Sequence, residues 1–186
     1  MNRLKQLFIT LPFLITMSLN STAQKQRNFL ALGDSYTIGE SVPIYESFPY
    51  QTVQLLRKKG MSVHAAEIIA KTGWTTDELM AGIEKTTFSQ SYDIVSLLIG
   101  VNNQFRGKDP SAYEQEFEKL LNKAIAFAGG NKQHVFVISI PDWGATPFAA
   151  NRDRTKIGKE IDQFNTINRK ITENAGIVYL SITEGS

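Results

Sequence analysis

Apolar, strand-like runs alternate along this chain with segments that repeat at helical spacing, and no other feature of the sequence constrains the fold as strongly. Five runs read as β-strands: residues 28–35, 61–70, 92–100, 134–142 and 177–182. Four segments between them read as α-helices: residues 47–60, 75–85, 109–130 and 156–176. Such alternation is typical of a parallel sheet with helices on both faces, joined by right-handed crossovers. We therefore predict a single α/β domain.

Two segments carry these periodicities most clearly. In residues 109–130 the apolar positions recur at helical spacing, and two glycines end the segment. Residues 92–100, YDIVSLLIG, are almost continuously apolar, as expected for a strand covered on both faces. At 186 residues, 42% of them hydrophobic, the chain is long enough for one buried core. The sequence has no cysteine, which excludes disulfides and cysteine-ligated metal sites.

The first residues have the layout of a secretory signal peptide. Arg3 and Lys5 precede an apolar run over residues 7–19, and small residues follow in Ser21-Thr22-Ala23. The run is short for a transmembrane anchor, which is the alternative. We therefore expect cleavage after Ala23, one domain over residues 24–186, and a secreted or periplasmic protein without a stable membrane span.

Charge also bears on the partners of this protein. Removal of residues 1–23 takes away two of the 20 basic residues and none of the 18 acidic residues, so the mature chain has no net charge. A nucleic-acid-binding protein needs a basic face, so we expect no nucleic-acid partner. Nothing in the sequence implies a partner protein.

Polar residues follow the predicted strands at the points where these strands end. Asp34 and Ser35 come after the first strand, Gly73 after the second, and Asn102 and Asn103 after the third. Ligands bind outside the carboxyl ends of parallel strands, so these residues are expected to meet at one edge of the sheet. A serine hydroxyl can act as a nucleophile once a base removes its proton. The backbone N–H groups of Ser35 and Gly73 and the side-chain amide of Asn102 can donate to an oxyanion.

Three of these segments resemble the first three sequence blocks of the SGNH/GDSL hydrolase superfamily. They are GDSYT at residues 33–37, AKTGWTTDEL at residues 70–79 and IGVNN at residues 99–103. The resemblance spans roughly residues 28–182. It implies a flavodoxin-like, three-layer α/β/α fold with a five-stranded parallel sheet, and the activity of a serine esterase or lipase.

The same resemblance implies the roles of the site residues. Ser35 would be the nucleophile, and Gly73 and Asn102 its oxyanion partners. The substrate would be a carboxylic ester, for example of an acetylated glycan or a lysophospholipid, and no metal or organic cofactor is implied.

The sequence departs from the superfamily pattern in two places. Asn103 stands where an aspartate is common, although an amide can still order the loop. The fourth block of the superfamily is an Asp-x-x-His after the fifth strand, and the sequence ends SITEGS without it. We therefore expect the 24–186 domain to be incomplete at its C-terminus. The alternative is a secreted, non-catalytic module of the same fold that binds carbohydrate or lipid.

The two histidines do not fill the place of the missing base. His134 begins the fourth strand, and His64 is predicted to lie inside the second, several residues before Gly73. A base must lie within about 3 Å of the proton that it removes. We therefore expect both histidines to be structural.

Four residues near the predicted site are candidates for contact with substrate: Asp34, Trp74, Asn103 and Trp143. Asp34 can instead serve the turn after the first strand. The two tryptophans either line a pocket or pack against the core, and the sequence leaves both readings open. Arg106 and Lys108 are expected in a solvated loop rather than at an anionic substrate.

Overall fold

The central element of the protein is a five-stranded, fully parallel sheet with the strand order β2-β1-β3-β4-β5. A computed structural model describes residues 25–88 and 91–183. The strands are β1 (Phe29–Gly33), β2 (Glu67–Ala70), β3 (Ile94–Leu98), β4 (Val135–Ile138) and β5 (Val178–Leu180). The predicted α/β class and five-stranded parallel sheet are thereby confirmed.

All four predicted helices are present, together with shorter ones. The α-helices are α1 (Ser35–Ile38), α2 (Phe48–Lys58), α3 (Thr76–Glu84), α4 (Val101–Phe105), α5 (Pro110–Phe127) and α6 (Arg154–Asn174). The 3-10 helices are η1 (Ile44–Glu46), η2 (Lys132–His134), η3 (Trp143–Ala145) and η4 (Pro147–Ala149). Thr75 is the N-cap of α3 and forms a capping box with Glu78.

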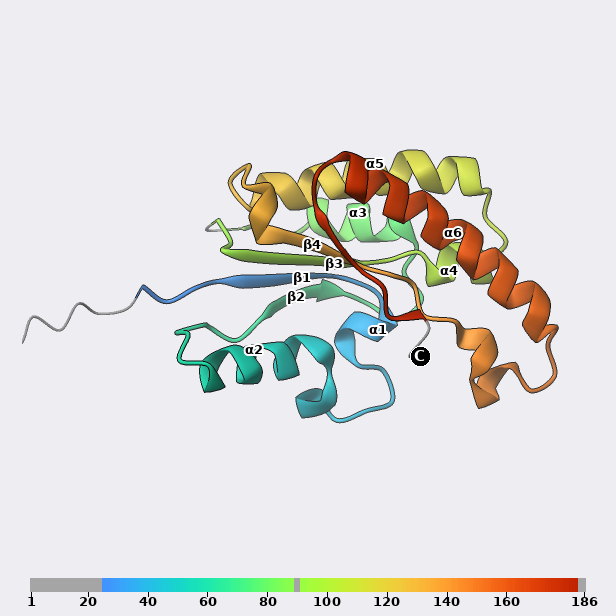
Figure 1. Ribbon diagram of the computed structural model, residues 1–186, viewed down its shortest axis with the longest axis horizontal. Coiled ribbons are helices and arrows are strands. Elements are labelled where there is room, and N and C mark those ends of the chain that lie inside the picture. Colours follow the sequence, from blue (N-terminus) through green and yellow to red (C-terminus); the bar gives the residue numbers. More distant parts are fainter. Residues whose placement is uncertain (1–24, 89–90, 184–186) are drawn as a thin grey trace, which may run out of the picture.

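The helices lie in two layers, one on each face of the sheet. Figure 1 shows α3, α5 and α6 on one face and α2 on the other. The larger hydrophobic cluster lies under α3, α5 and α6, and a smaller one of Phe29, Ala31, Val53 and Val63 lies under α2. The sheet is therefore the middle of three layers.

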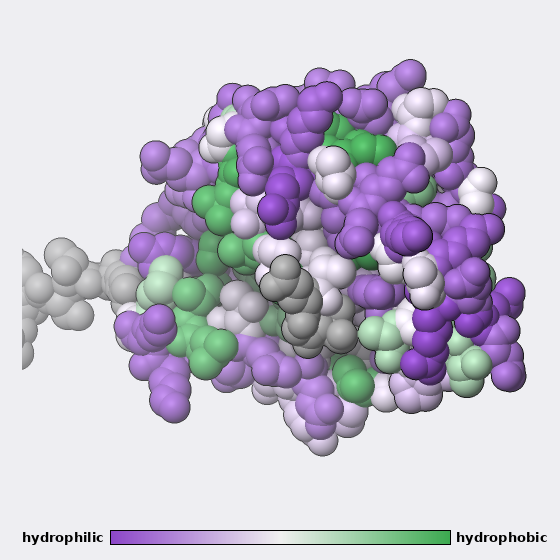
Figure 2. Space-filling view, turned by 45° about the vertical axis from the view of Figure 1, so that its right-hand side comes forward, coloured by the Kyte–Doolittle hydropathy of each residue, from purple (hydrophilic) through white to green (hydrophobic). Residues whose placement is uncertain are grey.

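Two strands differ from their predicted form. Residues 61–66 are not part of β2, and only a single bridge joins Val63 to Arg27. β5 lies at the edge of the sheet, where Val178 and Leu180 are 56% and 44% exposed. In the view of Figure 2, hydrophobic side chains gather on the left of a mostly hydrophilic surface.

The strand register brings the carboxyl ends of three strands to one level. Gly33, the last residue of β1, pairs with Ala70 of β2 on one side and with Leu98 of β3 on the other. The three loops that follow therefore begin beside one another.

Within residues 25–88 and 91–183, no helix is both long and apolar enough to cross a bilayer. The predicted signal peptide, residues 1–23, lies outside the described residues.

Candidate active site

Ser35 is held at a sharp turn from strand to helix. β1 ends at Gly33, Asp34 is the N-cap of α1, and Ser35 is the first residue of this one-turn helix. A Cβ at Gly33 would lie only 2.4 Å from the carbonyl oxygen of Leu98, so only glycine permits this close packing. The turn leaves Ser35 half-buried at the edge of the sheet. This is the position that a nucleophilic serine requires.

Asp34 lies beneath this turn and not at its surface. Its side chain is fully buried, and its Oδ1 accepts a hydrogen bond from the backbone N–H of Tyr36 at 3.0 Å. Its Oδ2 has no hydrogen-bond partner among the described residues. Burial raises the pKa of this carboxyl group to about 7. Asp34 therefore serves the turn after β1. Its burial does not allow the contact with substrate that was predicted from the sequence.

The raised pKa of Asp34 predicts a stability that falls as pH rises. Between about pH 4 and pH 7 the unfolded chain has released this proton and the folded chain still holds it. The free energy of unfolding should therefore decrease through that window and then become independent of this group. Asp34→Asn keeps the N-cap acceptor and removes the titration. From pH 4.5 to 7.5, the wild type should lose about 2–4 kcal/mol relative to this variant, measured by urea unfolding. Parallel pH profiles of the two proteins would contradict this explanation.

Gly73 lies in the loop between β2 and α3, with φ at +81°. Its carbonyl oxygen accepts a hydrogen bond from Arg106 Nη2 at 2.5 Å. Arg106 also forms an ion pair with Glu78 at 3.2 Å, so it is engaged with this loop. On the other side, the hydroxyl of Thr72 donates to the carboxylate of Glu40, in the segment that follows α1. The Gly73 loop is thus joined to the loops on both sides of it.

Asn102 and Asn103 lie next to each other on α4 but have different environments. Asn102 is half-buried, and its Nδ2 donates to the carbonyl oxygen of Trp74 at 2.9 Å. Since an amide NH2 group has two protons, one remains for a further acceptor. Asn103 is fully buried and its side chain forms hydrogen bonds with both the backbone and the hydroxyl of Thr76. Asn103 therefore supports the loop and does not reach a substrate, which corrects its proposed binding role.

The two tryptophans pack against neighbouring groups. The indole ring of Trp74 lies over α3, so close that a Cβ at Gly82 would be 2.3 Å from it. Trp143 is buried, and its Nε1 donates to Gln104 Oε1 at 2.7 Å. Its ring packs against those of Phe105 and Phe148, with centroids 5.2 and 5.8 Å away. Of the two interpretations that the sequence left open, packing therefore accounts for most of the surface of Trp74 and Trp143.

The sequence analysis did not identify Phe105 and Phe148, two exposed aromatic residues whose rings pack against Trp143. They are 47% and 73% exposed, and their ring centroids are 6.2 Å apart. Phe105 is three residues after Asn102 on α4, which places the two on one side of that helix. The three-residue spacing of Asn102 and Phe105 is compatible with a helix, but α4 is too short for this spacing to predict it.

Both histidines lie at the opposite end of the sheet from Ser35. The N–H of His64 donates to the carbonyl oxygen of Arg27, two residues before β1 begins. His134 directly precedes β4, whose first residue pairs with Val95 near the start of β3. At about 3.3 Å per strand residue, both are roughly 15–20 Å from the edge that carries Ser35. His64 precedes β2 instead of lying within it, but the prediction that neither histidine reaches Ser35 is unchanged. Within the described ranges, no group of three or more His, Asp or Glu residues could hold a metal ion.

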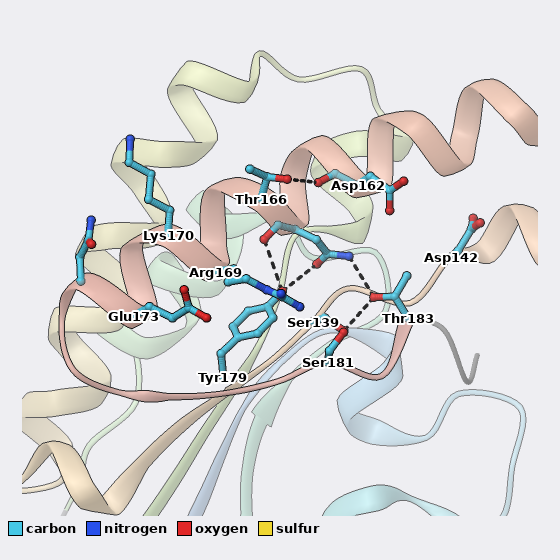
Figure 3. Close-up of a pocket in the computed structure, with 12 residues that line it drawn as sticks. Ser139, Asp142, Asp162, Thr166, Arg169, Lys170, Glu173, Tyr179, Ser181 and Thr183 are labelled. Carbon is cyan, nitrogen blue, oxygen red and sulfur yellow. Dashed lines mark hydrogen bonds between the residues drawn. The ribbon is translucent and has the colours of Figure 1, made fainter.

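A cavity of about 640 Å³ lies beside this edge, between α6 and β5. Figure 3 shows its polar lining, with Lys170 and Glu173 toward one end, Asp142 at the other, and Arg169 and Tyr179 between them. The ring of Tyr179 lies 4.9 Å below the guanidinium group of Arg169. The negative charge of Asp142 is one of the causes that raise the pKa of Tyr36, after burial and the charge of Asp34. This electrostatic effect links one end of the cavity to the residue that follows Ser35.

Comparison with known proteins identifies relatives of this chain. An arylesterase from Vibrio mimicus is 25% identical over 134 residues, which are 72% of this chain and 66% of the arylesterase. The fold matches the crystal structure of the lipase/acylhydrolase from Enterococcus faecalis, with a TM-score of 0.64 and 18% identity over 86% of this chain and 77% of that one. It also matches the SGNH-hydrolase family esterase AlinE4, with a TM-score of 0.63 and 19% identity over 85% and 77% of the two chains. Residues 31–185 match the family model of the GDSL-like lipase/acylhydrolases. This chain belongs to the GDSL-like lipase/acylhydrolase family.

Proposed function

We propose that this protein hydrolyses carboxylic esters by acyl transfer to Ser35. The main observation behind this proposal is that β1, β2 and β3 end side by side at the same edge of the sheet. Ser35, Gly73 and Asn102 each follow the end of one of these strands within four residues. A nucleophile and oxyanion donors must lie within a few ångströms of one carbonyl group. Membership of the lipase/acylhydrolase family supports the same reaction class.

The reaction has two steps in this assignment. Ser35 Oγ attacks the ester carbonyl carbon while a base removes the hydroxyl proton, and the alcohol leaves with that proton. Water then attacks the acyl-enzyme, releases the carboxylic acid and regenerates the serine. The N–H groups of Ser35 and Gly73 and the free amide proton of Asn102 donate to the oxyanion in both steps.

We propose that the base is a histidine outside residues 1–186. His64 and His134 are roughly 15–20 Å from the active edge, and a proton acceptor must come within about 3 Å. An Asp-x-x-His segment following β5 would supply both the base and the carboxylate that orients it.

The exposed rings of Phe105 and Phe148 favour esters with a hydrophobic acyl or alcohol group. The two rings lie beside the helix that carries Asn102 and are the exposed part of an otherwise buried aromatic cluster. Exposed hydrophobic groups next to a reactive centre are typical of substrate contacts. Of the two substrate classes considered, a lysophospholipid has such an acyl group, whereas an acetylated glycan does not.

The test compares the 186-residue chain with the product of the complete reading frame. The complete product should hydrolyse phenyl acetate, and Ser35→Ala should abolish this activity without changing the melting temperature. The 186-residue chain should stay near the background rate, and His64→Ala or His134→Ala should change nothing. If the reading frame stops after Ser186 and the chain binds sugar or lipid without turnover, the non-catalytic module is the better assignment.

We further propose that the protein is exported, because residues 1–23 combine a basic start, a short apolar run and a small-x-small site. N-terminal sequencing of the protein recovered outside the cytoplasm should begin at Gln24. A mature chain that retains residues 1–23 would contradict export by this route.

A further inference from the structure

The hydroxyl group of Thr76 lies between an amide and a carboxylate that come from two other helices. Thr76 is the first residue of α3 and is fully buried. Asn103 of α4 donates from Nδ2 to this hydroxyl at 2.6 Å and accepts from the Thr76 backbone N–H at 3.1 Å. Glu116 of α5 is the third member, because the Thr76 hydroxyl donates to its Oε2. We call these three residues the Thr76 cluster.

The direction of each hydrogen bond in this cluster follows from the number of protons. A threonine hydroxyl has one proton to donate and can accept through its lone pairs, whereas an ionised carboxylate only accepts. With its proton given to Glu116, the hydroxyl can only accept from residue 103. Asparagine meets this demand, because its Oδ1 accepts from the backbone and its Nδ2 donates to the hydroxyl. An aspartate would place an unprotonated oxygen against the lone pairs of the hydroxyl.

We propose that Glu116 is a positioning residue that requires an amide at position 103. Through Thr76, this pair holds the start of α3, three residues after Gly73, against the helix that carries Asn102. The role in catalysis rests on the proposed function, whereas the pairing of Glu116 with Asn103 does not. This pairing explains why Asn103, which departs from the superfamily pattern, is compatible with the carboxylate of Glu116 on a different helix.

Two ion pairs also join the start of α3 to the C-terminal end of α4 and the residues that follow it, but their side chains are more exposed than Thr76 and Asn103. The ion pair between Arg106 and Glu78 has side chains 45% and 41% exposed, and that between Lys108 and Asp77 has side chains 32% and 51% exposed. Exposed ion pairs usually contribute little to stability, because water screens them. A buried group that loses its partner is more costly, since it has no water to replace that partner. The hydrogen bonds between Asn103 and Thr76 are buried, so we expect them to contribute more than these ion pairs to holding the start of α3 against α4.

A double-mutant cycle on the 186-residue chain tests the pairing by urea unfolding at pH 7. Asn103→Asp should raise the equilibrium constant of unfolding at least tenfold, the scale of one unsatisfied buried hydrogen bond. In the Asn103→Asp background, Glu116→Gln should reverse most of this increase, because glutamine donates to Thr76 and frees its proton for the aspartate. Glu114 occupies an exposed position of the same helix. In the Asn103→Asp background, Glu114→Gln removes the same charge without changing the contacts of Thr76, so it should reverse little of the increase in the unfolding constant.

The outcomes separate the pairing from general effects of charge. Equal recovery by Glu114→Gln and Glu116→Gln, or no recovery by either, would overturn the proposal. If Asn103→Asp alone does not fold, the double variant with Glu116→Gln should regain a cooperative unfolding transition, and its failure to do so would also overturn it.

The positioning role is tested by kinetics on the product of the complete reading frame. Asn103→Asp should lower kcat with KM nearly unchanged, and the double variant should recover kcat. Recovery of stability without recovery of kcat would reduce the cluster to a structural role. An absence of esterase activity in every variant would reject the proposed function and leave the unfolding cycle to decide the pairing.

Discussion

Replacing Asn102 with alanine is expected to lower kcat for ester hydrolysis by about a hundredfold or more, with KM nearly unchanged. The side chain of Asn102 has one amide proton committed to the carbonyl oxygen of Trp74 and a second proton free. A donor to the oxyanion acts mainly in the transition state, so its loss affects kcat more than substrate binding. The measurement is steady-state hydrolysis of phenyl acetate by the product of the complete reading frame.

Asn103→Ala is the matched control for this prediction. Asn103 is fully buried and bound to Thr76, so its loss should lower the melting temperature more than Asn102→Ala does and lower kcat less. The two neighbouring amides should thus separate chemistry from stability. If Asn102→Ala melts early but keeps its kcat while folded, the oxyanion role of Asn102 is wrong.

Replacing Gly100 with alanine should cost about 3 kcal/mol or more of stability, a loss of roughly 10 °C in Tm. Gly100 has φ at +133°, which strains any residue with a Cβ, and it directly precedes α4. A Cβ there would lie 2.7 Å from the hydroxyl oxygen of Tyr113 and 2.7 Å from Cδ1 of Ile140. Tyr113 cannot easily move away, because its buried hydroxyl donates to Ile99 and accepts from Asn168.

Gly107→Ala distinguishes backbone strain from steric clash. Gly107 also has a positive φ, +64°, but a Cβ there would meet no atom within 4 Å. This variant should therefore lose only about 1 kcal/mol, the usual cost of the left-handed conformation. Thermal melts of the two variants measure the difference. Equal losses would mean that the contact of Gly100 with Tyr113 does not limit substitution.

The sequence by itself determined the order of elements and the edge of the sheet at which the candidate site lies. The four long helices and five strands carry periodicities that each segment shows locally. Because parallel strands align their carboxyl ends, the positions of Ser35, Gly73 and Asn102 followed from that order alone. The family resemblance added their roles, and the register of β1, β2 and β3 places all three at one level.

The tertiary structure alone decided which polar residues of that edge face outward. Asp34 and Asn103 are adjacent in sequence to Ser35 and Asn102, but both are fully buried. The helices that orient them, α1 and α4, have four and five residues. Isolated helices of this length are not stable, so no local pattern predicts them. They form because of contacts with distant segments, such as that of Gly33 with Leu98 and that of Gly100 with Tyr113. The side-chain orientations at the site therefore depend on packing between residues far apart in the chain, which the sequence does not show.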